Sequence, residues 1–421
     1  MADPSAWLAR AAEDARFAWH CRGLDLVLRV EVGEGADTIR RGLRLSASPA
    51  VLTENDARAL SADIVIAGQA SAIDQIAQPA PPPGLQSFGA WLRHDTGLKI
   101  TGDPLIIAQA LAALERLVEL ARPDAGPGAA ITFATDPARV HGQQRLLTGP
   151  GGTALIHWLH SGAEGDTPLL YLHTAGADAR QYRHQLADLD LIDRGASYAF
   201  DMPWHGYSGG VDGVESTHAY TLTEPDYLSW CTGFIEQVIA RPVIVVGCSM
   251  GAAMALTLTA RRPDLIAGCL ALEAPLSAPG RYNDLLTDAR VADSQHNPSY
   301  VRALLSPTAP QRYRDEAAAI YAQGRPGVYM GDLAYYSNEY DGSRLAEPLR
   351  QAGRPIELLT GAYDYSASPD NTRRLEASIN APDLVTFTEM PALGHFPMIE
   401  DPQAFRPYLL AALDRLDRKD R

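Results

Sequence analysis

The chain has 421 residues, of which 46% are apolar and 21% are charged, and this composition excludes a disordered or fibrous protein. The 36 basic and 51 acidic residues leave a net charge of −15, which disfavours a nucleic acid as partner because phosphate binding depends on Lys and Arg. Only Lys99 and Lys419 are lysines, so the sequence offers no polybasic anchor for a membrane.

The N-terminus has no apolar stretch of the kind found in signal peptides, and the four cysteines lack a metal-binding or disulfide spacing. We therefore expect a reduced, cytoplasmic protein with no metal site and no cofactor.

The first 125 residues predict a small α+β domain. Residues 24–32 place an apolar side chain at every second position, which indicates a half-buried strand. Asp103 and Pro104 provide an N-cap and a first-turn proline for a helix that runs to about Ala121. The Pro- and Gly-rich segment 122–128 interrupts both patterns, so we expect one domain over 1–125 and a second over 129–421.

Short apolar strands alternate with helical stretches after residue 129, which predicts an α/β domain with a doubly wound, mostly parallel sheet. The expected strands cover residues 153–160, 169–173, 197–200, 242–246, 266–272, 355–360 and 384–388.

Residues 275–354 are too long for a simple connection and contain eight of the 17 tyrosines. Rings with a hydroxyl suit a helical lid over a small-molecule pocket. The alternative is an insertion whose tyrosines only pack on the sheet domain.

The segment Gly247-Cys-Ser249-Met-Gly251 joins an apolar strand to a helix. This Gly-x-Ser-x-Gly pattern is typical of a nucleophile elbow, in which a strained serine projects into a cleft. The alternative is a tight turn with an inert serine. As a nucleophile, Ser249 needs a base, and His395 follows the last expected strand on a loop before a closing helix.

An acid that orients His395 should follow a strand between Ser249 and His395 in sequence. Asp364 follows the strand that ends near Thr360, and Glu273 ends the preceding strand. We favour Asp364 and keep Glu273 as the alternative acid.

A developing oxyanion needs backbone N–H donors. Met250, directly after the serine, is one candidate, and Ala175, in the small-residue loop after the strand 169–172, is the other, with Thr174 next in order.

These features together resemble the α/β-hydrolase superfamily over about residues 130–421. Gly361-Ala-Tyr-Asp364 and Gly394-His395 match the acid and base motifs of that family. The resemblance implies that Ser249, His395 and Asp364 are nucleophile, base and acid, and that the insertion is a cap. Thr174 and Trp204 occupy positions where the family often has glycine. Thr174 lies in the loop that is expected to supply an oxyanion donor, so this difference concerns which residue of the loop is the donor.

Segments 63–68 and 100–103 of the first domain are loosely similar to sterol-carrier-type lipid-binding domains. Such a domain would bind an apolar ligand, support a homodimer or cover the pocket.

The sequence therefore predicts a serine hydrolase that cleaves an ester or lactone of a small, moderately apolar acyl compound. Two alternatives remain: a hydrolase of C–C bonds next to a ketone, using the same three side chains, and a non-catalytic binder of apolar ligands.

Overall fold

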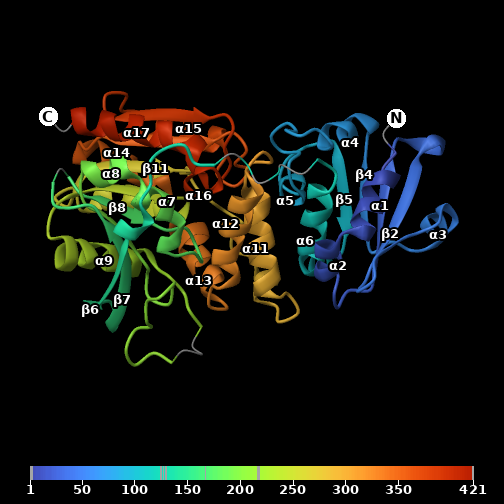
Figure 1. Cartoon of the computed structure of the whole chain (residues 1–421), viewed down its shortest axis with the longest axis horizontal. Helices are drawn as coiled ribbons and strands as arrows, with labels where there is room; N and C mark the ends of the chain where they lie inside the picture. Colours follow the sequence, from blue (N-terminus) through green and yellow to red (C-terminus); the bar gives the residue numbers. More distant parts are fainter. Residues whose placement is uncertain are drawn as a thin grey trace. The chain divides into compact units, whose positions relative to one another are not determined.

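The computed structural model describes residues 3–419 except 124, 125, 127, 129, 166 and 216–218. The chain divides into two compact units (Figure 1). The first unit consists of residues 1–128 and 284–318, and the second consists of residues 129–283 and 319–421. The expected domain ends, Ala125 and Ala129, lie outside the described residues.

The first unit is built on a five-stranded sheet of order β3-β2-β1-β4-β5. In its central strand β1, exposure alternates along the chain, as the period-2 pattern predicts, because one face packs on the core and the other does not. The strands are β1 (Leu26–Val32), β2 (Ile39–Leu45), β3 (Ala50–Val51), β4 (Ile64–Gly68) and β5 (Leu98–Gly102).

Helix α6 (Pro104–Glu119) supplies much of the core of this unit. The Asp103 carboxylate caps its start by accepting from Leu105 N–H at 2.8 Å, as the sequence predicts. The other helices are α1 (Ser5–Glu13), α2 (Ala15–His20), η1 (Gly35–Asp37), α3 (Glu54–Ala59), α4 (Ala70–Ile76), α5 (Phe88–Trp91), η5 (Asp284–Thr287) and α11 (Asp293–Leu304).

Residues 284–318 group with the first unit, whereas the sequence pattern assigns them to the insertion of the second domain. Helix α11 packs against α6, and Arg302 and Arg314 both form ion pairs with Glu119 of α6. Contacts between segments so far apart produce no pattern in the local sequence, so the sequence could not predict this grouping. Helix α12 (Gln311–Ala322) continues from this segment into the second unit.

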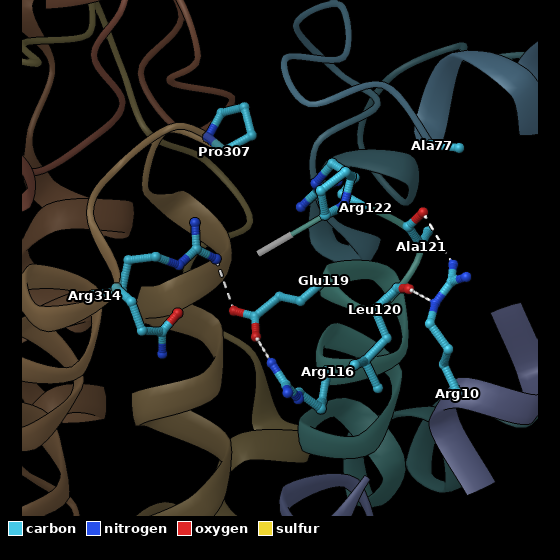
Figure 2. A pocket seen from close by; sticks show the side chains of 11 residues that line it. Arg10, Ala77, Arg116, Glu119, Leu120, Ala121, Arg122, Pro307 and Arg314 are labelled. Carbon is cyan, nitrogen blue, oxygen red and sulfur yellow. Dashed lines mark hydrogen bonds and ion pairs between the residues drawn. The ribbon is translucent and has the colours of Figure 1, made fainter. Parts of the chain in front are cut away.

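The first unit also holds a cavity of about 630 Å³ with a wall rich in arginine (Figure 2). Arg10 Nε donates to the Leu120 carbonyl at 2.9 Å, and Arg314 Nη2 donates to Glu119 at 2.7 Å. Four arginines and Glu119 share this wall with apolar residues such as Leu120 and Pro307, and the apolar-ligand role of the domain stays a prediction. The sterol-carrier likeness and the homodimer stay predictions.

The second unit is built on an eight-stranded sheet of order β13-β12-β11-β10-β8-β9-β7-β6. The first six of these strands run parallel, and β7 and β6 are antiparallel to their neighbours. The strands are β6 (His141–Gly149), β7 (Gly152–Ser161), β8 (Leu169–Leu172), β9 (Ser197–Phe200), β10 (Val243–Cys248), β11 (Ile266–Leu272), β12 (Ile356–Gly361) and β13 (Val385–Met390).

Helices cover this sheet; α10 packs on β10 and β11, and α17 packs on β11 and β12. They are η2 (Pro137–Arg139), η3 (Ala179–Tyr182), α7 (Arg183–Ala187), α8 (Leu189–Arg194), α9 (Glu224–Phe234), η4 (Ile235–Ile239), α10 (Met250–Arg261), α13 (Val328–Ala334), η6 (Tyr335–Glu339), α14 (Gly342–Ala352), α15 (Pro369–Ile379), α16 (Pro397–Glu400) and α17 (Pro402–Lys419). Among the described residues, no helix combines the length and the apolar character needed to cross a lipid bilayer.

Every residue of strands β8, β10, β11 and β12 is buried. Their carboxyl ends, with that of β13, lead into the candidate residues: Ser249 follows β10, Glu273 follows β11, Asp364 follows β12 and His395 follows β13. Neighbouring parallel strands end at the same edge of a sheet, and ligands of open α/β folds bind there.

Candidate active site

Ser249 lies between β10 and α10 in a backbone conformation that residues with a side chain rarely adopt, with φ 55° and ψ −116°. The two flanking glycines make this turn possible. A Cβ on Gly247 would lie 2.1 Å from the Gly251 carbonyl oxygen, and a Cβ on Gly251 would lie 2.3 Å from the Leu172 carbonyl oxygen. A strained conformation of this kind persists only where the surrounding structure enforces it, as it does at many functional sites.

His395 is buried on the loop between β13 and α16. The Cys248 thiol donates to the His395 carbonyl oxygen at 3.2 Å, so the residue before Ser249 holds the main chain of His395. Gly361, at the end of β12, approaches the same loop so closely that a Cβ there would lie 2.5 Å from the Gly394 carbonyl oxygen. The ends of β10 and β12 therefore fix the histidine loop from two sides.

Asp364 accepts hydrogen bonds on both carboxylate oxygens. Its Oδ2 lies 2.7 Å from His395 Nδ1, and its Oδ1 accepts from Ser366 N–H at 2.6 Å and from Ala367 N–H at 3.0 Å. Burial alone would raise the pKa of Asp364, but His395 above all, with these donors, lowers it. An ionised Asp364 accepts the Nδ1 proton of His395, which leaves Nε2 as the basic nitrogen of the ring.

Within the described part of the chain, no hydrogen bond joins His395 Nε2 to Ser249 Oγ. The structure thus brings His395 and Asp364 together and ties the histidine loop to Cys248, but the expected link between serine and histidine is not formed. In the absence of substrate, such catalytic hydrogen bonds are often long and tighten only when substrate binds.

Glu273, the alternative acid, belongs to the same buried cluster. It has a positive φ of 54°, and both of its side-chain oxygens accept from Gly361 N–H, at 2.9 and 3.1 Å. Burial, and then the neighbouring Asp364 carboxylate, raise the pKa of Glu273 well above its usual value. The two shifts are opposite, because burial beside Asp364 favours the protonated form of Glu273 whereas His395 favours the ionised form of Asp364.

Glu273, Asp364 and His395 are also residue types that bind metals, and their ligand atoms lie within 4.8 Å of one another. Their hydrogen bonds use those atoms, since His395 Nδ1 faces Asp364 Oδ2 and the oxygens of Glu273 accept from Gly361. A cation would have to displace these bonds, so the geometry fits a hydrogen-bonded relay better than a metal centre.

The loop after β8 presents a backbone donor at Ala175. Thr174 N–H donates to Gln181 at 3.0 Å, and Gly176 N–H donates to Asp332 at 2.7 Å. Among the described residues, Ala175 N–H has no hydrogen-bond partner. The alternative donor, Thr174, is therefore already occupied, and Ala175 remains available. The close approach of Gly251 to the Leu172 carbonyl places this loop beside the start of α10, where Met250 lies.

Sequence reasoning missed the side chains that support this loop. Asp332 of α13 is fully buried. Its carboxylate accepts hydrogen bonds from Gly176 N–H and from the Tyr220 hydroxyl at 2.9 Å, and it lies 2.8 Å from His205 Nε2. Burial lowers the pKa of His205, but Asp332 more than offsets this effect and raises it. Asp332 lies in a helix with no motif around it, so the sequence held no signal for it.

A model described as the alpha/beta hydrolase family matches residues 169–407, more than half of the chain. The chain belongs to the alpha/beta hydrolase family. This alpha/beta hydrolase has the predicted fold class, with a mostly parallel sheet covered by helices and a further α+β region. Comparison with curated proteins finds no match.

Several solved structures share the fold at low identity. An esterase from Thermogutta terrifontis is 18% identical, with a TM-score of 0.54 over 64% of this chain and 99% of that one. The enol-lactonase from Burkholderia xenovorans LB400 is 17% identical, with a TM-score of 0.55 over 64% and 100%. A bromoperoxidase from Bacillus anthracis is 14% identical, with a TM-score of 0.54 over 65% and 100%. Identity this low shows the fold alone.

Proposed function

We propose that this alpha/beta hydrolase cleaves a carboxylic ester or lactone of a small acyl compound through an acyl-enzyme. Ser249 is the nucleophile, His395 is the general base and acid, and Asp364 orients and stabilises the imidazolium. Met250 N–H and Ala175 N–H bind the oxyanion. The esterase and lactonase among the structural neighbours are consistent with this chemistry.

The observation that carries the proposal is the buried 2.7 Å contact between His395 Nδ1 and Asp364 Oδ2. The loop of His395 is also bonded to Cys248, the residue before Ser249, whose backbone is strained. A serine hydroxyl is a weak nucleophile and needs a base of fixed orientation. The pair supplies that base, with Nε2 free to take a proton.

The reaction then has two halves. Ser249 Oγ attacks the carbonyl carbon while its proton passes to His395 Nε2, and the carbonyl oxygen becomes an oxyanion between the two N–H groups. The leaving alcohol takes the proton from His395 as the C–O bond breaks. Water then attacks the acyl-enzyme, with His395 as base, and releases the acid and the free serine.

The insertion contributes to this site from η6. The Tyr336 side chain, which is buried, lies close enough to Ser249 for the serine hydroxyl to affect its pKa. We propose that the part of the insertion within the second unit, residues 319–354, acts as the lid over the pocket.

The test replaces Ser249 with Ala and measures the hydrolysis of 4-nitrophenyl esters. We expect kcat to fall by about 10⁴-fold or more, because the variant loses the covalent route altogether. A fluorophosphonate should label wild type at Ser249. The control is Ser48→Ala, at an exposed serine of the first unit, which should retain activity.

Wild-type turnover by Ser249→Ala would overturn the proposal, and so would the absence of both labelling and turnover. Cleavage of a diketone that depends on Ser249, with no turnover of matched esters, would decide for the C–C alternative. Unlabelled serine in a protein that binds apolar ligands would decide for the non-catalytic alternative.

A further inference from the structure

The proposed oxyanion donor, Ala175 N–H, lies in a four-residue turn after β8. Ala177 N–H donates to the Thr174 carbonyl oxygen at 3.1 Å, which closes this turn. Gly176, at its third position, has a φ of 68°, as a type II turn requires. Peptide groups are planar, so the direction of Ala175 N–H is fixed only when the residues on both sides of it are held.

Asp332 of α13 holds the residue after Ala175. Its Oδ2 accepts from Gly176 N–H at 2.7 Å, and its side chain is fully buried. A flip of the peptide group between Ala175 and Gly176 would turn the Ala175 carbonyl oxygen toward this carboxylate in place of the N–H. The flip would cost a buried hydrogen bond and bring two acceptor oxygens together, so Asp332 keeps the turn in one conformation.

The Asp332 carboxylate is itself held in place. The Tyr220 hydroxyl donates to its Oδ1 at 2.9 Å, and His205 Nε2 lies 2.8 Å from its Oδ2. The ring of His205 is fixed in turn, because its Nδ1 lies 2.9 Å from the Pro203 carbonyl oxygen, which can only accept. A carboxylate anchored in this way is a rigid support for Gly176.

Tyr321 of α12 holds the residue before Ala175. The hydroxyls of Tyr321 and Thr174 are hydrogen-bonded to each other, and Thr174 N–H donates to Gln181. Gln181 Nε2 also donates to Tyr321 Oη at 3.3 Å, and all three side chains are buried. The two residues that flank Ala175 are therefore both bonded to side chains of the insertion.

The insertion also packs directly on the turn. A Cβ on Gly176 would lie 2.8 Å from Tyr329 Cβ of α13, so helix and turn meet at backbone distance. Backbone N–H groups stabilise an oxyanion strongly only when they point at its position before the reaction begins. Catalytic groups must be held to within about 0.5 Å for this effect. The contacts with α12 and α13 supply that rigidity.

We propose that Asp332 and Tyr321 are positioning residues for the oxyanion donor Ala175, so that the insertion completes the catalytic site as well as covering it. This inference rests on the proposed function and gives the insertion a role in the chemical step. Its signature is a loss of kcat at nearly constant KM, because the oxyanion exists in the transition state and not in the bound ester.

The experiment measures kcat and KM on a 4-nitrophenyl ester, and the Ki of a trifluoromethyl ketone, to which Ser249 adds to form a tetrahedral oxyanion. Asp332→Leu removes the acceptor of Gly176 N–H. Its kcat should fall by about 100-fold and its Ki should rise by about the same factor, as for the loss of one oxyanion donor. Tyr321→Phe should change both values by about 10-fold. KM should stay within about threefold of wild type in both variants.

Two further variants separate positioning from folding. Asp332→Asn keeps an acceptor oxygen for Gly176 N–H and should bring kcat to within about fivefold of wild type. Asp264→Leu makes the leucine substitution at an exposed acid of the second unit that pairs with Arg262, and its kcat and Ki should match wild type. Thermal unfolding shows which variants are folded. A protein that is only destabilised loses active molecules but keeps the wild-type Ki, because Ki reports on the sites that remain.

The two proposals fail in different ways. If turnover depends on Ser249 but Asp332→Leu and Tyr321→Phe keep the wild-type kcat and Ki, the positioning role is wrong and the hydrolase stands. A fall in kcat without a change in Ki would overturn the positioning role as well. If Asp332→Leu does not fold, Tyr321→Phe decides by the same two measurements. If wild type neither hydrolyses the ester nor reacts with a fluorophosphonate at Ser249, both proposals fall.

Discussion

Each unit of the molecule buries a carboxyl group that accepts two backbone hydrogen bonds. The pKa values of these two carboxyl groups nevertheless shift in opposite directions. Glu115 of the first unit accepts from Phe88 N–H at 2.9 Å and Gly89 N–H at 2.8 Å, and burial raises its pKa to about 8. Asp364 of the second unit accepts from Ser366 and Ala367, and its pKa is lowered despite burial.

The difference lies in the neighbouring charge. His395 touches Asp364, whereas the charged groups near Glu115 have only minor effects on its pKa. Two N–H donors are therefore not enough to keep the buried carboxyl of Glu115 ionised, whereas the further contact with His395 favours the ionised form of Asp364. Near neutral pH, Glu115 is a protonated group of the core, and Asp364 is an anion that can stabilise a charged imidazole.

The largest expected effect is that of Asp364→Asn. The amide has no charge and can hold His395 in the wrong tautomer, so we expect kcat on a 4-nitrophenyl ester to fall by about 10⁴-fold. The matched control is Asp370→Asn, at the exposed start of α15, which should retain most of the activity. A variant Asp364→Asn within tenfold of wild type would show that the contact with His395 does not serve catalysis.

The second prediction concerns Glu115→Gln and the pH dependence of stability. In the wild type, the pKa of Glu115 is about 4.5 in the unfolded chain and about 8 in the folded one. Between these values the folded state binds more protons, so the free energy of unfolding falls as pH rises, by an amount of order 5 kcal/mol, and is level above pH 8.

The glutamine in Glu115→Gln does not titrate. The fall in the free energy of unfolding with rising pH that Glu115 causes should therefore be absent from this variant. The measurement is the midpoint temperature of thermal unfolding at pH 5, 6, 7 and 8. The midpoint temperatures of wild type and of Glu13→Gln, an exposed control in α1, should fall by the same amount as pH rises. The midpoint temperature of Glu115→Gln should change less with pH. Equal slopes in all three proteins would contradict a protonated Glu115.

Local patterns were enough to predict much of the second unit. Its buried strands are continuous apolar runs, and the glycines around Ser249 are required by contacts near 2 Å, so both are visible in a few consecutive letters. Strand β6 was missed because eight of its nine residues are not buried, which leaves no apolar alternation to recognise.

The rest of the site depends on contacts between distant segments. Asp332 and Arg281 come from the insertion, and each bonds to a residue more than 80 positions away: Gly176 N–H donates to Asp332, and Arg281 donates to the Ser366 hydroxyl. No spacing rule connects such residues. The sequence favoured Asp364 but kept Glu273 as the alternative acid, since both follow strands that end at one edge of the sheet.

The smallest expected effect, that of Glu273→Gln, decides this choice between acids. Glutamine can still donate to Asp364 as the protonated Glu273 does, so kcat should stay within about fivefold of wild type, whereas Glu273→Leu removes the donor and should cost about tenfold. If Glu273→Gln instead loses about 10⁴-fold while Asp364→Asn is active, then Glu273 is the anion that serves His395. In that case the contrast with Glu115 fails, because the ionised carboxyl would be the one whose pKa burial raises.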